Sequence, residues 1–296
     1  MAFVTPRKRL RFQPRVEALE DRLVPTIQLP ISQTGSTLVV QGDNGPDNFT
    51  FNDNGQGTID VVVNGDFLQN FTGVNTLNVT VVGGNDKIVY NLAKDMILGQ
   101  TRTLNVSLGN GNNSFTANLN NRQLQSSVLG SAAASLTFNI HGGHQRSKIV
   151  FNAMNMDIQT RATLNENVTG GIGNDTIISN FSGRLDGLLN PQFDAGLGHN
   201  VVKAMVDVTN ASSLGTLGTS STTSKLKGTG GTNTFTYIVH TKQPNPQNFI
   251  FAEIDAGSSA DTAVFTSFTP PGAKTPAFVT VKGFGKGKTT AQPFTP

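Results

Sequence analysis

The stretch LNVTVVGGNDKIVYNL (77–92) contains the unit that decides the fold. Two short segments of alternating apolar and polar residues flank a corner of glycine, asparagine and aspartate. The same arrangement returns in LNVSLGNGNNSFTANL (104–119), LTFNIHGGHQRSKIVFNA (136–153) and LNENVTGGIGNDTIISNF (164–181), and LVVQGDNGPDNFTFND (38–53) precedes them. Alternation with a period of two indicates β-strands with one buried face, and glycine with asparagine favours tight turns. The chain is therefore built from a repeat.

Weaker copies of the unit follow at 193–208, 225–240 and 253–268. The corners recur every ~26 to 34 residues, a period typical of solenoids and repeat arrays. One unit cannot bury its apolar residues alone, whereas stacked units can. Because a strand rises ~3.3 Å per residue, a coil of three short strands with turns takes roughly 22 to 30 residues. The spacing predicts an all-β protein, a parallel β-helix or solenoid with about seven or eight coils.

A β-sandwich built from the same short strands is the alternative architecture. The return segments between units vary in length while the corners keep their place in the unit. Loops on a solenoid behave in this way, so the pattern favours the solenoid over the sandwich.

Alternation also predicts which side chains face the core. Leu77, Val79 and Val81 face inward before one corner. Ile88, with either Tyr90 or Val89, faces inward after it. The residue equivalent to Ile88 is apolar in nearly every copy, which predicts a continuous core column. Its expected members are Phe115, Ile149, Ile177, Val201, Phe235 and Val264.

Asparagine ends several of the units. Either these side chains stack as a hydrogen-bonded ladder at a second corner of each coil, or each one occupies a turn because asparagine tolerates a left-handed backbone. The residues concerned are Asn91, Asn118, Asn152 and Asn180.

Composition and charge exclude several classes of protein. The 296 residues include no cysteine, which excludes disulfides, thiolate metal sites and a cysteine nucleophile. The isoelectric point is about 9.2, but residues 23–270 contain 12 basic and 16 acidic residues. A nucleic-acid-binding surface needs a basic stripe on the folded body, so we expect no nucleic-acid partner. No apolar run approaches the ~18 residues of a membrane span.

We divide the chain into three parts. Residues 1–26 form a leader segment in which charge is concentrated, residues 27–270 form the repeat domain, and residues 271–296 form a basic tail rich in glycine and proline. The leader contains PRVEALEDRLVP (14–25), which resembles the R-x-x-L-E-x-L-E-D-R-x-x-P motif that opens many large planctomycete surface proteins. The resemblance implies export to an extracellular or cell-surface location. The matching residues are Arg15, Glu17, Leu19, Glu20, Asp21, Arg22 and Pro25, while Val16 stands where leucine is commoner.

The corner GGIGNDTII (170–178) fits the nine-residue pattern G-G-x-G-x-D-x-U-x. It resembles the hemolysin-type (RTX-like) calcium-binding β-roll repeat, here in a degenerate form. The resemblance implies calcium between successive turns, bound by the aspartate carboxylate and by glycine carbonyls. The candidate ligands are Asp47, Asp86, Gly171, Gly173, Asp175 and Asp261.

Only about half of the copies keep the acid of this repeat. The equivalents of Asp175 elsewhere include asparagine at 113 and 200, and calcium takes six to eight oxygen ligands. Any calcium affinity should therefore be weak. The alternative is that glycine with asparagine or aspartate is simply what a left-handed corner requires.

No pattern for catalysis is present, so we expect that the protein is not an enzyme. The four histidines show no H-x-x-x-H spacing and no G-x-S-x-G occurs. The alternative is a polysaccharide-active parallel β-helix enzyme, which would require two carboxylates and a base to converge on one groove.

The sequence thus predicts an exported structural or adhesive solenoid that presents a regular polar surface. Its expected partners are extracellular glycans, surface proteins or other copies of the chain. A calcium-gated folding unit, exported unfolded and folding outside the cell, is a further hypothesis.

Overall fold

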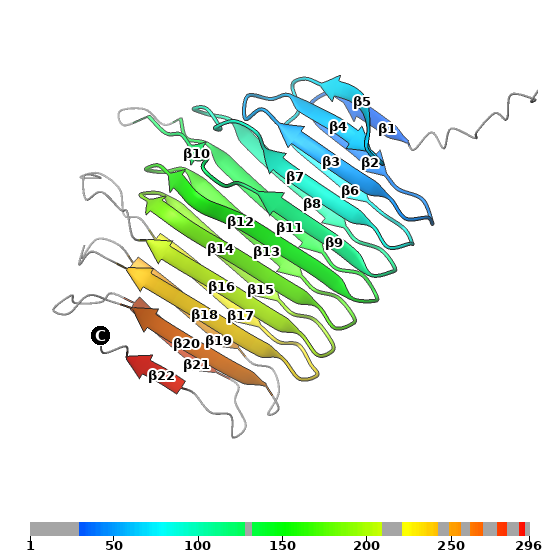
Figure 1. Cartoon of the computed structure of the whole chain (residues 1–296). Helices are drawn as coiled ribbons and strands as arrows, with labels where there is room; N and C mark the ends of the chain where they lie inside the picture. The colour runs from blue at the N-terminus through cyan, green and yellow to red at the C-terminus, as the bar shows by residue number, and fades with distance from the viewer. Residues whose placement is uncertain are drawn as a thin grey trace, which may run out of the picture.

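The computed structural model describes residues 30–127, 132–208, 221–241, 249–255, 261–268, 277–282 and 290–293. These residues form β-strands, turns and loops, and the strands stack into two facing sheets (Figure 1). The leader expected at 1–26 and much of the segment 271–296 lie outside the described residues.

The first sheet, sheet A, has ten strands. In spatial order they are β1 (Ile31–Thr34), β2 (Thr37–Gln41), β6 (Thr76–Thr80), β8 (Thr101–Ser107), β11 (Ser135–His141), β13 (Thr163–Thr169), β15 (Leu188–Asp194), β17 (Ser221–Lys227), β19 (Phe249–Asp255) and β21 (Ala277–Lys282).

The second sheet, sheet B, has twelve strands. Its main path is β22 (Thr290–Pro293), β20 (Thr262–Phe268), β18 (Thr234–Thr241), β16 (Val201–Val208), β14 (Thr176–Leu185), β12 (Ser147–Ile158), β9 (Asn113–Asn118), β7 (Lys87–Leu92), β3 (Asn48–Asp53), β4 (Ile59–Val63) and β5 (Asp66–Phe71). The short strand β10 (Gln123–Leu124) pairs with β12.

The chain alternates between the two sheets, and successive coils stack in parallel, which confirms the predicted solenoid. Each coil contains one strand of sheet A, a corner, one strand of sheet B and a return. The strands form nine such pairs, from β2–β3 to β21–β22, against the expected seven or eight, because the last pair lies beyond residue 270. The predicted unit of two strands and a variable return is found in most coils; in the described residues, strands occur in the return after β3, which contains β4 and β5, and in the return after β9, which contains β10.

The N-terminal end of the solenoid is closed by antiparallel strands that the repeat does not predict. β1 pairs with β2, and β4 and β5 continue from β3 as a meander. Asn64 and Gly65 form its tight turn with φ of 52° and 94°, the backbone that a two-residue hairpin requires. The meander covers an edge that would otherwise offer unpaired backbone groups to another chain.

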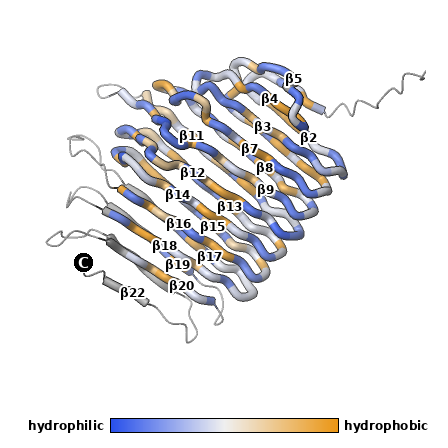
Figure 2. The backbone as a smooth tube through the Cα atoms, viewed as in Figure 1, coloured by the Kyte–Doolittle hydropathy of each residue, from blue (hydrophilic) through white to orange (hydrophobic). Residues whose placement is uncertain are grey.

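The core lies between the sheets and consists of buried apolar side chains from both of them. Hydrophobic and hydrophilic residues alternate along the strands (Figure 2). The inward residues predicted in the unit 77–92 are buried, and of the two alternatives after Ile88 it is Tyr90 that is buried, whereas Val89 is partly exposed. The column through Ile88 is confirmed for four of its expected members, Phe115, Ile149, Ile177 and Phe235.

Two expected members of that column were wrong by one residue. Val202 and Ala263 are the buried ones, whereas Val201 is 45% exposed and Val264 is partly exposed. Each lies next to another apolar residue, so alternation could not decide between them, and a slip of one residue exchanges the two faces of a strand.

The asparagine ladder is present on the outer face of sheet B. The Nδ2 atoms of Asn91, Asn118 and Asn152 each donate to the Oδ1 atom of the asparagine in the preceding coil, over 2.8, 2.8 and 3.2 Å. The acceptor of the first bond is Asn52. Asn180 stands in register with Asn152. The ladder is therefore confirmed, although its asparagines lie within the strands of sheet B and not at a second corner. Among the described residues no helix is long and apolar enough to cross a membrane.

Candidate functional site

In each of the eight coils from β2–β3 to β19–β20, one polar residue lies at the point where the chain enters sheet B, and together these described residues form the corner column. All of its members are buried, although every one is polar or charged. Side chains of this kind must find hydrogen-bond partners inside the protein, because burial without them is costly. The members are Asp47, Asp86, Asn113, Ser147, Asp175, Asn200, Asn233 and Asp261.

Five side chains of the column accept hydrogen bonds from the backbone of the preceding coil, those of Asp86, Asn113, Asp175, Asn200 and Asp261. Oδ1 of Asp86 accepts from the N–H of Asp47 over 2.9 Å, and Oδ1 of Asp175 accepts from the N–H of Ser147 over 2.7 Å. Oδ1 of Asp261 likewise accepts from the N–H of Asn233 over 2.7 Å. The column thus satisfies backbone N–H groups at a bend between the two sheets.

The glycines of the corner are needed for close contact between coils. Gly171 has a φ of 103°, and a Cβ there would lie 2.3 Å from the carbonyl oxygen of Gly143. Gly173 has a φ of 139°, and a Cβ there would lie 2.6 Å from the carbonyl oxygen of Gln145. Only glycine fits this combination of backbone and space. The carbonyl oxygen of Gly171 accepts from the N–H of Leu197 over 2.8 Å.

Burial changes the acidity of the column carboxyls. It raises the pKa of Asp175 to about 6, although the backbone N–H and hydroxyl of Ser147 oppose the shift. Burial also raises the pKa of Asp47 and of Asp86. The negative charges of Asp47 and Asp43 raise the pKa of Asp86 further. The Oδ2 atoms of Asp86 and Asp175 have no hydrogen-bond partner.

The donor set of the corners is small for a calcium ion, which takes six to eight oxygens. Of the acidic candidates, Asp47 and Asp86 lie in adjacent coils, whereas Asp175 lies between Ser147 and Asn200. Asp261 lies beside Asn233. Within the described ranges no three acidic or histidine side chains come together as a metal site. That these residues bind calcium stays a prediction.

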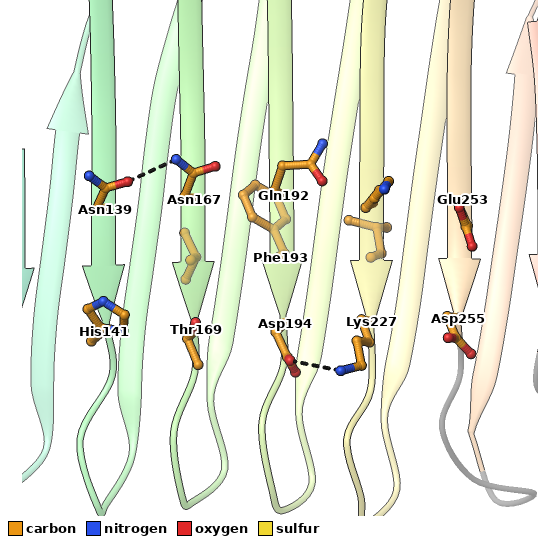
Figure 3. Close-up of a pocket in the computed structure, with 13 residues that line it drawn as sticks. Asn139, His141, Asn167, Thr169, Gln192, Phe193, Asp194, Lys227, Glu253 and Asp255 are labelled. Carbon is orange, nitrogen blue, oxygen red and sulfur yellow. Dashed lines mark hydrogen bonds and ion pairs between the residues drawn. The ribbon is translucent and has the colours of Figure 1, made fainter. Parts of the chain in front are cut away.

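The second polar site is a groove of about 450 Å³ on the outer face of sheet A, the sheet A groove (Figure 3). Five strands, from β11 to β19, each contribute two outward side chains. The row nearer the strand centres consists of Asn139, Asn167, Gln192, Lys225 and Glu253. The row nearer the corners consists of His141, Thr169, Asp194, Lys227 and Asp255.

The groove side chains are in register across the coils. Nδ2 of Asn167 donates to Oδ1 of Asn139 over 2.9 Å. Nζ of Lys227 lies 3.4 Å from Oδ2 of Asp194, and the next strand brings Asp255 level with Lys227 on its other side. The lysine side chain is 55% exposed, so this ion pair contributes little to folding. The groups are therefore available to a partner.

The sequence reasoning missed this groove because outward polar residues resemble an ordinary solvated face. A signal was present in the segments Lys225–Lys227 and Glu253–Asp255, where like charges stand two residues apart in consecutive copies. Such charges share one face of a strand, and the repeat register sets the two strands side by side.

The core itself contains two buried charged sites. Asp53 accepts from Nε and Nη2 of Arg102 over 2.5 and 3.1 Å, and from the Tyr90 hydroxyl over 2.6 Å. Glu166, on β13, is completely buried, and neither carboxyl oxygen has a hydrogen-bond partner of good geometry. Burial raises the pKa of Glu166 to about 7, with a small opposing effect of the Ser179 hydroxyl.

In comparison with known proteins, the chain matches no family model, no curated protein and no solved structure. Its function is therefore inferred from the chemistry of its own surfaces. The acidic groups of the corner column are buried, whereas the polar side chains of the sheet A groove lie on the outer face of that sheet.

Proposed function

We propose that the protein is an exported structural or adhesive solenoid that presents a regular polar surface to extracellular glycans, surface proteins or other copies of itself. The observation that carries this proposal is the register of the outward side chains, which repeats from coil to coil on both faces. A surface of this kind offers a partner the same contact many times, so that weak contacts add up.

The outward side chains are held in place before any partner arrives. On sheet A, Asn105, Asn139 and Asn167 each donate to the asparagine of the preceding coil over 2.8, 2.8 and 2.9 Å, beginning at Asn78. The asparagine ladder on sheet B holds its side chains in place by hydrogen bonds of the same kind. Fixing side chains in advance lowers the entropy lost on binding. The fixed side chains support a surface that binds a partner over a surface that only contacts solvent.

The test is co-sedimentation of the purified full-length chain with cell envelopes of the organism that encodes it. One variant carries Asn105→Lys and Asn139→Lys on sheet A, and a matched variant carries Asn91→Lys and Asn118→Lys on sheet B. We expect the wild type to sediment and at least one variant, folded by circular dichroism, to lose binding. Wild-type protein that stays in the supernatant would contradict the proposal.

A second candidate function, polysaccharide cleavage, is favoured by one feature of the sheet A groove. Asp194 and Asp255 lie two strands apart with Lys227 between them. Two strand spacings amount to ~9.6 Å, near the upper end of the roughly 6.5–9.5 Å between the carboxyl groups of inverting glycosidases. Release of reducing ends from polysaccharides that is lost in Asp194→Asn would support this activity, and no release by the wild type would reject it.

A further inference from the structure

The sheet A groove has a period that selects the kind of polymer it can hold. Strands in a sheet lie ~4.8 Å apart, so a chain lying across them meets a new pair of side chains at that interval. An extended peptide advances only ~3.3 Å per residue, and a nucleic-acid strand in a duplex advances ~3.4 Å per nucleotide. One sugar of an extended polysaccharide is close in length to the strand spacing. A polysaccharide therefore stays in register with the coils.

The side chains of the groove suit hydroxyl groups. Asn139, Asn167 and Gln192 present amides, and Thr169 presents a hydroxyl. Amides and hydroxyls can both donate and accept hydrogen bonds, as the hydroxyls of a sugar require. The amides stand on three consecutive strands of the centre row (Figure 3). Each successive sugar would therefore meet an equivalent polar group.

The charges of the groove are nearly balanced. Two lysines stand against three carboxylates, and Lys227 is already paired with Asp194. A polyanion would meet the carboxylates of Asp194, Glu253 and Asp255 as well as the lysines. An uncharged polymer pays no such electrostatic penalty.

We propose that the sheet A groove binds a neutral, linear, extended polysaccharide whose chain runs across the strands, along the solenoid axis. This inference rests on the proposed function and specifies the class of partner. The groove spans five strands, so it accommodates about five sugars at one sugar per ~4.8 Å strand spacing.

The test is isothermal titration of the full-length chain with β-1,4-linked oligosaccharides of glucose, xylose and mannose, each from two to eight sugars long. In at least one series we expect affinity to rise with length up to about five sugars and then to level, because five strands line the groove. Oligomers of galacturonate, of the same lengths but charged, should bind less tightly.

The matched variants are Asn167→Ala in the groove and Asn118→Ala in the equivalent ladder on sheet B. Loss of one hydrogen-bonding side chain should weaken binding by about twofold to tenfold in Asn167→Ala, and Asn118→Ala should bind as the wild type does. Equal weakening in both variants would overturn the location of the site.

Failure to bind any neutral series, tighter binding of galacturonate, or affinity independent of length would each overturn the inference. Co-sedimentation with envelopes separates this failure from that of the proposed function. If the wild type sediments with envelopes but binds no neutral oligosaccharide, only the inference fails. If it does neither, both fail.

Discussion

The first coil and the middle of the solenoid treat a buried carboxyl in opposite ways. In the first coil, Asp53 is completely buried and receives hydrogen bonds from Arg102 and Tyr90. In the middle of the solenoid, Glu166 is equally buried but has no such partner. The first carboxyl is therefore held as an anion by a cation, whereas the second avoids the cost of burial by keeping its proton.

The difference arises because each core position is surrounded by residues from neighbouring coils. Arg102 points inward from β8, two coils beyond β3, where it reaches Asp53. Glu166 lies in register between Phe138 of β11 and Pro191 of β15, and the hydroxyl of Ser179 on the facing sheet lowers the pKa of its carboxyl only in part. In a solenoid, the charge of a buried group is thus decided by what adjacent repeats supply.

Removing the cation from the paired site should have the largest effect. Arg102→Met leaves Asp53 as an uncompensated buried charge, and we expect the free energy of unfolding to fall by about 3–5 kcal/mol. The matched control is Arg184→Met, because Arg184 pairs with Asp186 but is 38% exposed. That change should cost less than about 1 kcal/mol. Chemical denaturation measures both, and equal losses would refute the comparison.

Glu166→Gln should abolish much of the change in stability between acidic and neutral pH. With its folded pKa raised from 4.5 to about 7, Glu166 binds more protons in the folded state than in the unfolded state between these values. The free energy of unfolding therefore decreases as pH rises through this window, by about 3 kcal/mol in total. Relative to wild type, Glu166→Gln should gain this amount between pH 4 and pH 8.

Denaturation at the two pH values measures that gain, and Glu253→Gln is the control for an acid outside the core. A difference between Glu166→Gln and wild type that stays constant with pH would show that the Glu166 carboxyl is not protonated in the fold.

The two tyrosines of the chain allow a smaller comparison of the same kind. The hydroxyl of Tyr90 donates to the Asp53 carboxylate over 2.6 Å, whereas the hydroxyl of Tyr237 shares a neutral hydrogen bond with Ser224 over 3.0 Å. Tyr90→Phe should cost about 1.5–3 kcal/mol and Tyr237→Phe about 0.5–1.5 kcal/mol, since bonds to charged groups are stronger. A reversed order in thermal unfolding would contradict the ionised state of Asp53.

Asp175 is intermediate between Asp53 and Glu166, because one of its carboxyl oxygens has a backbone hydrogen-bond partner and the other has none. Asp175→Asn keeps the acceptor and should change the free energy of unfolding by less than about 1 kcal/mol. Asp175→Ala leaves the N–H of Ser147 without a hydrogen-bond acceptor and should lower the free energy of unfolding by about 1–3 kcal/mol. Thermal unfolding distinguishes the two. The same measurement with chelator and then with calcium tests the calcium prediction, which requires a calcium-dependent rise in Tm that Asp175→Asn removes.

Sequence periodicity predicted the features that repeat from coil to coil. The corners, the inward residues of 77–92 and the ladder at Asn91 follow from local alternation and turn chemistry, which a single strand already displays. Position 201 was misassigned because two adjacent valines leave the pattern ambiguous, and only the buried Asn200 beside them fixes which one faces inward.

Features that depend on contacts between coils could not be read in the same way. Arg102 and Asp53 are 49 residues apart, and the sequence between them includes the meander of β4 and β5, which does not repeat. The sheet A groove likewise becomes visible only when strands more than twenty residues apart are set side by side.

The most direct measurement is the pKa of Glu166 itself. The chain contains four glutamates, at 17, 20, 166 and 253, so selective ¹³C labelling of glutamate carboxyls gives four resonances, one of which Glu166→Gln removes. We predict that this resonance titrates near pH 7, while the protein remains folded. Titration of the Glu166 carboxyl near 4.5, with its charge accommodated in the core, would contradict the account.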